Sequence, residues 1–208
     1  NLIIMNNTIY NNNYYGIYFD RGANNNKIID NLFINNFENG INIRNSSNNF
    51  IMGGKISNSV KSAIVLQGDS LNNSFSNIII ENTNPAYYDF AAEIYIFPYY
   101  FNFVRINNTS FENMKILRYK FGESGGIITY GNHFGEIKFL EDVNGSGMNF
   151  SEDIQLNYNS AIVKAENNPG LQKSANITLK NLPGNFVNPI ILKNGIECPL
   201  SICTPYTD

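Results

Sequence analysis

Residues 27–44 read KIIDNLFINNFENGINIR, and this stretch decides how the chain folds. Three apolar runs, KII, LFI and INI, are separated by clusters of Asp, Asn and Glu. Isoleucine and phenylalanine favour β-strands, whereas asparagine favours the turns between them. No helical spacing of apolar residues lasts long enough to compete with this pattern. The stretch therefore predicts three short strands joined by tight bends.

The same arrangement recurs on both sides of this stretch, at intervals of about 23 residues. LIIMNNTIYNN precedes YYGIYF in residues 2–19, and FIMGGKISNS precedes KSAIVL in residues 50–66. Three series follow the period: Asn12, Asn36, Ser59, Asn82 and Asn113; Asn7, Asn31, Gly54, Asn77 and Asn108; and Ile17, Ile41, Ile64 and Ile94. One supersecondary unit is therefore stacked several times.

Three strands and three bends in about 23 residues predict one coil of a right-handed parallel β-helix, an all-β solenoid. Each strand pairs with its equivalent one coil away, so equivalent side chains stack on one another. Two internal apolar ladders are expected, Ile17, Ile41, Ile64 and Ile94, and Phe19, Ile43, Leu66 and Ile96. Asparagine tolerates left-handed backbone angles, and its amide can bond to the coils on both sides. We therefore expect asparagine ladders at the bends.

These coils resemble the Asn-rich parallel β-helix repeats of the pectin-lyase-like superfamily, especially the NosD-like proteins common on archaeal surfaces. The resemblance covers residues 1–122. It implies the fold but leaves the function open, because that superfamily holds lyases, hydrolases, adhesins and structural surface proteins. NNPGLQKSANITLKNLPG and NGIECPLSIC, near the C-terminus, resemble a module that often follows such repeats in archaeal surface proteins. That likeness implies an extracellular location.

The pattern divides the chain into three parts. Residues 1–122 form the repeats, residues 123–150 form a last coil or a transition, and residues 151–208 form a small antiparallel β-sandwich or a β cap. Asn194-Gly195 between apolar runs is a strong signal for a two-residue hairpin loop. A cap is expected because the end of a solenoid exposes unpaired strand edges.

The composition narrows the class of partner. The chain has 208 residues, of which 43% are hydrophobic and only 15% charged, and it contains 39 Asn. A net charge of −3 without a basic run makes nucleic acid a poor partner. No apolar stretch has the length of a membrane span. Asn1 already lies in the phase of the repeat, so we expect a processed or truncated segment of a longer protein.

Several residues could be modified or could form a site. Cys198 and Cys203 are expected to form a disulfide, which fits an oxidising exterior. Eight Asn-x-Ser/Thr motifs are candidates for glycosylation: Asn6, Asn45, Asn72, Asn107, Asn108, Asn144, Asn149 and Asn176. An insertion within residues 83–92 interrupts the fourth coil beside an aromatic-rich run, and its rings could pack within the chain, contact a partner or stack on a sugar. The candidate contact surface comprises Tyr87, Tyr88, Phe90, Tyr99 and Tyr100.

Signals for metal binding or catalysis are weak. Asp142, Asn144, Ser146 and Gly147, with Asp153, resemble an EF-hand calcium loop, but Asp replaces the final Glu and helices do not flank it. Glu81 and Glu112 could share one column in adjacent coils. Polygalacturonase-like signatures such as Gly-His-Gly are absent, and we interpret His133 as structural. No cofactor is expected.

These features favour a non-enzymatic, extracellular structural or adhesive surface protein. It would be a building block of an envelope layer, sheath or filament, and it would associate with itself, with other surface proteins or with glycans. The alternative is a carbohydrate-binding or carbohydrate-cleaving β-helix protein.

Overall fold

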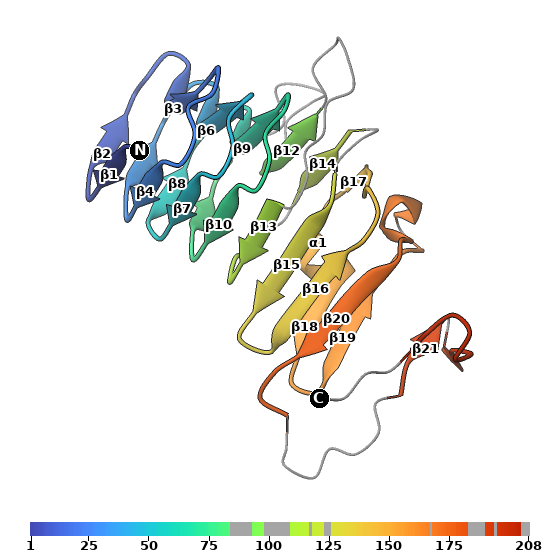
Figure 1. Ribbon diagram of the computed structural model, residues 1–208. Coiled ribbons are helices and arrows are strands. Elements are labelled where there is room, and N and C mark those ends of the chain that lie inside the picture. The colour runs from blue at the N-terminus through green and yellow to red at the C-terminus, as the bar shows by residue number, and fades with distance from the viewer. Residues whose placement is uncertain are drawn as a thin grey trace.

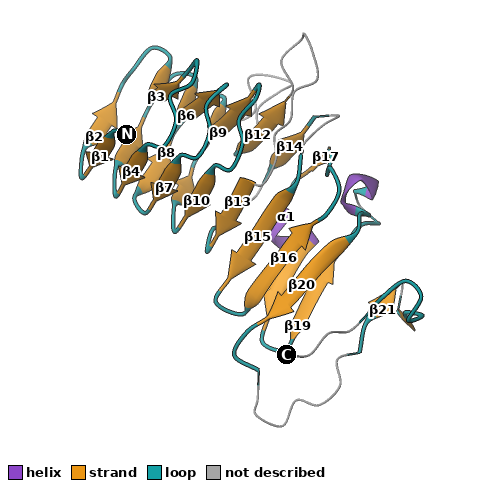
Figure 2. Cartoon of the chain, viewed as in Figure 1, coloured by secondary structure: helices purple, strands orange, loops and turns teal. Residues whose placement is uncertain are grey.

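The computed structural model describes residues 1–83, 93–97, 109–116, 118–122, 126–166, 168–182, 190–193 and 195–204. Figures 1 and 2 show a β-solenoid that continues into antiparallel strands. The described residues include two short helices, α1 (Phe150–Asp153) and η2 (Pro169–Leu171). Neither of them is long and apolar enough to cross a membrane. The predicted all-β solenoid is confirmed.

Each of the first four coils contributes one strand to each of three parallel sheets. Sheet A contains β1 (Ile3–Met5), β4 (Lys27–Ile29), β7 (Phe50–Met52), β10 (Ser74–Ser76), β13 (Thr109–Glu112) and β15 (Ile128–Asn132). Sheet B contains β2 (Thr8–Tyr10), β5 (Leu32–Ile34), β8 (Lys55–Ser57) and β11 (Ile79–Glu81). Sheet C contains β3 (Tyr15–Phe19), β6 (Asn39–Arg44), β9 (Ser62–Gln67), β12 (Ile94–Phe97) and β14 (Tyr119–Phe121).

The strand register confirms both predicted apolar ladders. In sheet C, Ile17 pairs with Ile41, Ile41 with Ile64, and Ile64 with Ile94. The ladder two residues further on follows the same register, and all eight side chains are buried. On sheet A the inward column contains Phe75 and Phe111, whose stacked rings lie 5.5 Å apart, and it continues through Tyr130. The core is therefore one continuous apolar column inside the three sheets.

Asparagine at the bends occupies two neighbouring columns with different functions. The first holds residues with left-handed backbone angles, such as Asn11, Asn35, Asn58 and Asn82, with φ between 50° and 56°. The strand register places Asn82 and Asn113 in such columns, so the predicted series Asn12, Asn36, Ser59, Asn82 and Asn113 is wrong in its last two members. Asn77 is likewise equivalent to Gly53, not Gly54. Since both columns favour asparagine, counting this residue cannot separate them.

The second column points inward and ties each coil to the next. At the bend before each sheet A strand this column is Asn26, Asn49 and Asn73, all buried, and the left-handed residues preceding them are Asn25, Asn48 and Asn72. Asn49 Oδ1 accepts hydrogen bonds from the backbone N and from Nδ2 of Asn26, at 3.0 and 2.9 Å. Asn73 Oδ1 accepts the same pair from Asn49, both at 3.0 Å. The expected amide ladders are therefore present, and they satisfy backbone N–H groups that the strands cannot reach.

At its C-terminal end the solenoid passes into a cap without a break in two of its sheets. Sheet A continues through β16 (Gly135–Phe139) and β20 (Ala175–Leu179), both antiparallel to their neighbours. Sheet C ends in β17 (Gly145–Gly147), antiparallel to β14. A separate hairpin pairs β18 (Ile154–Asn157) with β19 (Ser160–Val163). Of the two predicted alternatives, this pairing fits a β cap, because β20 extends a solenoid sheet.

A buried polar network joins the last solenoid strand to the cap. The Tyr119 hydroxyl, on β14, donates a hydrogen bond to Asp153 Oδ2 at 2.8 Å and accepts one from Asn168 Nδ2 at 2.7 Å. Burial is the main cause that raises the pKa of Tyr119 above its usual value, and the Asp153 carboxylate adds to it. The phenol therefore stays protonated and serves as a donor.

Tyr119→Phe is expected to lower the free energy of unfolding by about 2 kcal/mol, because Asp153 and Asn168 each lose a buried partner. The raised pKa also makes the contribution of Tyr119 to the free energy of unfolding depend on pH. An unfolded tyrosine loses its proton near its ordinary pKa, so this contribution is complete below about pH 10 and is lost as the pH rises further. Urea denaturation at neutral and alkaline pH checks both effects, and the variant should lose less stability with rising pH than the native chain. An equal alkaline loss in the two proteins would contradict this assignment.

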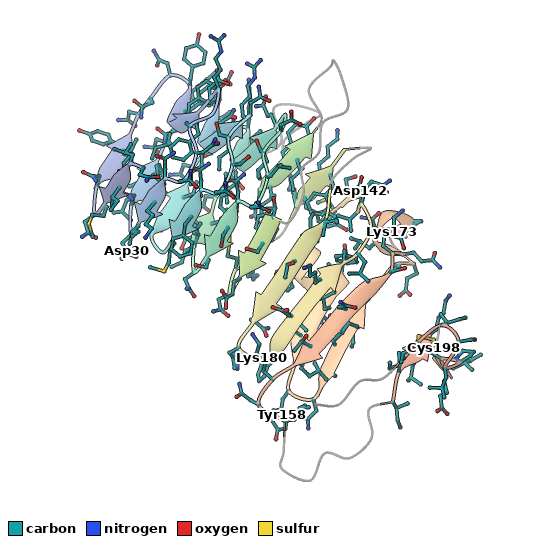
Figure 3. The ribbon with its side chains drawn as sticks, viewed as in Figure 1. Asp30, Asp142, Tyr158, Lys173, Lys180 and Cys198 are labelled. Atoms are coloured by element: carbon teal, nitrogen blue, oxygen red, sulfur yellow. A yellow bond between two sulfur atoms is a disulfide. The ribbon has the colours of Figure 1, made fainter. Side chains whose placement is uncertain are left out.

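The last described residues form a small hairpin that carries the disulfide. Strands β21 (Leu192–Lys193) and β22 (Ile196–Glu197) pair in antiparallel fashion, with Lys193 opposite Ile196, in agreement with the hairpin predicted there. The predicted disulfide between Cys198 and Cys203 is present. Figure 3 shows Cys198 in this hairpin, apart from Tyr158 and Lys180 of the cap.

Candidate functional site

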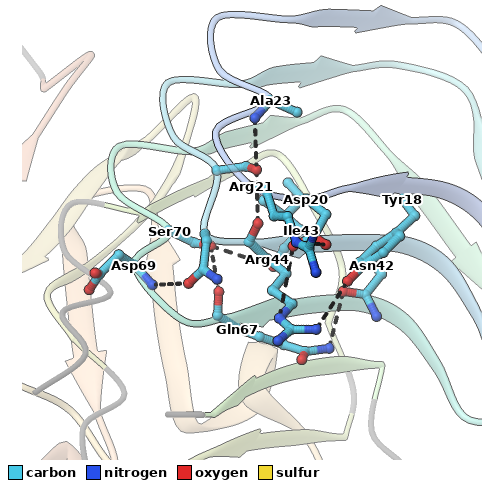
Figure 4. Close-up of polar contacts among 12 residues, drawn as sticks. Tyr18, Asp20, Arg21, Ala23, Asn42, Ile43, Arg44, Gln67, Asp69 and Ser70 are labelled. Carbon is cyan, nitrogen blue, oxygen red and sulfur yellow. Dashed lines mark hydrogen bonds and ion pairs between the residues drawn. The ribbon is translucent and has the colours of Figure 1, made fainter. Parts of the chain in front are cut away.

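A polar and aromatic cluster lies on the outer face of sheet C in the first three coils (Figure 4). Strand alternation creates it: Ile17 and Phe19 point into the core, so Tyr18 between them points to solvent. Arg44 Nη1 lies 3.5 Å from the Tyr18 hydroxyl, and its Nε lies 3.9 Å from Asp20 Oδ1. One coil further on, Gln67 Nε2 donates to Asn42 Oδ1 at 3.1 Å. We call Tyr18, Asp20, Asn42, Arg44 and Gln67 the outer-face cluster.

Two further tyrosines extend this cluster into an aromatic strip. The Tyr15 ring lies 5.0 Å from the Tyr18 ring and 6.2 Å from the Tyr14 ring. Tyr14 is 65% exposed and Tyr18 41% exposed, so both rings are open to a ligand. Burial, followed by the nearby Glu38 carboxylate, raises the pKa of Tyr15 to about 12. Its phenol is therefore neutral at physiological pH.

The cluster is better suited to binding than to acid–base chemistry. Exposed aromatic rings pack on the apolar faces of sugars, while a guanidinium bonds to hydroxyl groups. Asn42 is 1% exposed and accepts a hydrogen bond from Gln67, so its amide positions the cluster rather than meeting a ligand. The carboxylates nearby are held in ion pairs: Glu38 with Lys61 at 2.6 Å, and Asp20 with Arg44. Across the described residues, no group of three or more His, Cys, Asp and Glu side chains converges.

Sequence reasoning missed this cluster because its members do not repeat. The inward positions of sheet C are apolar in coil after coil, and one of them is always isoleucine in the first four coils, whereas the outward position changes from Tyr18 to Asn42 to Val65. The signal available in the sequence was that Tyr18 lies between Ile17 and Phe19, two apolar positions of the inward ladders, which places Tyr18 on the outer face.

The aromatic contact surface predicted at Tyr87, Tyr88, Phe90, Tyr99 and Tyr100 lies outside the described residues, as do Asn107 and Asn108. The pairing of Glu81 with Glu112 in one column is wrong. Glu81 pairs with Ser57 in sheet B, whereas Glu112 pairs with Ser76 in sheet A. Equivalent residues of sheet A are 24 positions apart at Met52 and Ser76 but 36 apart at Ser76 and Glu112, so a count at the regular period misaligned them.

The residues of the calcium-like motif are not arranged as a loop around an ion. Gly145–Gly147 form strand β17, where Ser146 pairs with Lys120. The Asp153 carboxylate is bonded to Tyr119, and Figure 3 shows Asp142 at the edge of the cap near Lys173. This geometry does not support a calcium site there.

The remaining residues predicted from the sequence differ in their solvent exposure. The glycosylation candidates Asn6, Asn45, Asn72 and Asn176 are exposed, whereas Asn144 and Asn149 are half-buried. Asn149 also caps α1 by accepting a hydrogen bond from the Glu152 backbone N at 3.2 Å. His133 lies in the β15–β16 turn, 3.7 Å from the Phe134 ring, and its carbonyl oxygen accepts from Asn181 Nδ2.

Three stacked sheets, inward ladders and a closed end define this molecule as a β-solenoid protein with an outer-face cluster. A comparison with known families identifies the family within this class. Residues 1–143 match the family described as the right handed beta helix region, and the chain belongs to that family. No curated protein and no solved structure matches it significantly. The β-helix part of the predicted resemblance is confirmed, while the likeness to NosD-like archaeal proteins and their C-terminal module stays a prediction.

Proposed function

We propose that this chain is a non-enzymatic, extracellular structural or adhesive protein, a building block of an envelope layer, sheath or filament. The observation that carries this proposal is the buried amide ladder at the bend of Asn26, Asn49 and Asn73, which links one coil to the next. A rod whose bends are hydrogen-bonded from coil to coil resists bending and shear, as a load-bearing surface protein must. The ion pairing of Glu38 and of Glu81, which binds Lys55 at 2.7 Å, also supports a structural role for the acidic residues.

Two features support the extracellular location. The Cys198–Cys203 disulfide suits an oxidising exterior, and the exposed sequons at Asn6 and Asn176 suit glycosylation there. The NosD-like and archaeal-type resemblance belongs to the same proposal.

Electron microscopy of the protein in its native envelope tests this function. An ordered layer, sheath or filament containing the chain is the expected result. Release of reducing or unsaturated sugars by the purified protein would overturn the non-enzymatic assignment.

Glycan binding is the second candidate, and the aromatic strip of Tyr14, Tyr15 and Tyr18 favours it. Tyr18→Ala is expected to weaken binding of surface oligosaccharides by about 1–3 kcal/mol, if a sugar stacks as aromatic ligands do. Calorimetric titration with a panel of neutral and acidic oligosaccharides measures this change. Tyr158→Ala is the matched control, since Tyr158 is exposed on the cap, 56% accessible and outside the strip. Equal affinities for the two variants would remove this candidate.

A further inference from the structure

The outer face of sheet A is apolar in the first three coils. Because side chains alternate along a strand, the first and third residues of β1, β4 and β7 point away from the core. Ile3 and Met5 are 61% and 51% exposed, while Ile29, Phe50 and Met52 are half-buried among their neighbours on the same face. Met5 pairs with Ile29 and Ile29 with Met52, so these side chains form one continuous surface. We call Ile3, Met5, Ile29, Phe50 and Met52 the apolar face.

The same outward positions are polar further along sheet A. They are Ser74 and Ser76 on β10, and Ser110 and Glu112 on β13. The inward positions stay apolar from β1 to β13, so the fold itself does not require apolar residues on the outside. A contiguous apolar surface confined to three coils therefore marks a site of contact with another molecule.

The apolar face lies along the side of the solenoid. Figure 1 shows β4, β7 and β10 side by side along the length of the solenoid. Coils stack along that length, so a further coil at either end would lengthen the solenoid without covering the outer face of sheet A. A contact made by this face therefore does not depend on where the chain begins or ends.

Two opposite charges flank the apolar face on the second coil. Lys27 begins β4, Asp30 follows this strand at the next bend, and both are exposed. Neither takes part in an ion pair among the described residues. The Asp30 carboxylate lies against Gly53 of the next coil, where a Cβ would collide with it, and Figure 3 shows Asp30 at the side of the solenoid. The face thus carries a cation at one edge and an anion at the other.

These charges limit how two such faces can meet. Two identical sheet faces pack face to face across a two-fold axis that lies between them. An axis parallel to the strands would set Lys27 against Lys27, and like charges repel. An axis parallel to the solenoid instead makes the strands of the two copies antiparallel, so Lys27 of each copy meets Asp30 of the other. Phe50 of each copy then faces Met52 of the other.

We propose that the apolar faces of two copies of this chain pack together across a two-fold axis parallel to the solenoid. The inference rests on the proposed building-block function and names its lateral contact. Two reciprocal pairs of Lys27 with Asp30 set the register, coil opposite coil, and the apolar side chains between them exclude water. The two solenoids run side by side in the same direction.

A charge placed in the middle of the face tests the contact. Ile29→Asp buries a carboxylate between two sheets, whereas Ile162→Asp places the same charge on β19 of the cap, where Ile162 is 42% exposed. Sedimentation velocity over a concentration series should show dimers for the native chain and for Ile162→Asp. Ile29→Asp should remain monomeric, with circular dichroism confirming that it folds. A native chain that is monomeric at every concentration, or an Ile29→Asp variant that dimerises as the native chain does, would overturn the proposal.

Charge reversal tests the two-fold arrangement itself. Lys27→Glu puts two like-charged pairs across the axis, and Asp30→Arg does the same with the opposite sign. The left-handed backbone at Asp30 tolerates arginine, since Arg21 has the same conformation, with a φ of 52°. At low salt, we expect each variant alone to dimerise about tenfold more weakly than the native chain.

A mixture of the two reversed variants supplies the sharpest result. Both opposite-charge pairs are restored in a heterodimer of Lys27→Glu with Asp30→Arg, so this heterodimer should be as tight as the native dimer. A mixture as weak as either variant alone would overturn the two-fold arrangement. An ordered native assembly that survives Ile29→Asp would retain the building-block function and reject this contact. Restored heterodimers of a chain that forms no ordered envelope assembly would support the contact and reject that function.

Discussion

Asn49→Ala is expected to lower the free energy of unfolding by about 3 kcal/mol, which is a large part of the stability of an ordinary domain. The side chain is 1% exposed, and its Oδ1 accepts from both the backbone N and Nδ2 of Asn26. Truncation leaves the buried Asn26 N–H without its acceptor, and it also leaves a cavity between coils. Urea denaturation followed by circular dichroism measures the change.

Asn48→Gly is the matched control for this variant. Asn48 precedes Asn49, has a φ of 58°, and is exposed. Glycine adopts that backbone conformation freely, so we expect a change within about 1 kcal/mol. If the two variants lost equal stability, the inward column would have no special role and asparagine would act simply as a bend former.

The regular part of the fold could be predicted from the sequence because inward positions repeat. Ile17, Ile41, Ile64 and Ile94 occupy one column, and only a stacked unit puts the same side chain in the same place four times. The sequence also located the bends, but it could not tell the left-handed position of each bend from the inward one. Asn82 has the left-handed backbone of Asn58 rather than the inward amide of Asn36, and both positions favour the same residue.

The cap and the outer-face cluster could not be predicted in detail, because neither repeats. β16 reverses direction against β15 in a sheet whose first six strands are parallel, and this reversal depends on the turn around His133 and on the antiparallel pairing with β20. Tyr18 and Arg44 come together through register between coils. Their chemistry differs from coil to coil, so periodicity carried no information about them.

Phe150→Ala is expected to have the other large effect, because this ring holds the cap on the solenoid. Phe150 is 1% exposed and packs edge-on against three rings, those of Tyr119 at 4.9 Å, Phe121 at 5.6 Å and Tyr130 at 5.4 Å. Loss of a buried phenylalanine costs about 3–5 kcal/mol through lost burial and the cavity left behind. Because these partners lie on β14 and β15, the loss should fall on the junction between solenoid and cap.

Hydrogen exchange read by mass spectrometry can locate this loss. We expect faster exchange in β14, β15 and the β18–β19 hairpin of Phe150→Ala, with the first three coils unchanged, since their ladders do not pass through the ring. Met148→Ala is the control, because Met148 lies two residues away and is 69% exposed. Uniformly faster exchange along the whole rod would mean that the cap and the coils unfold as one unit. The cap would then stabilise every coil rather than simply close one end.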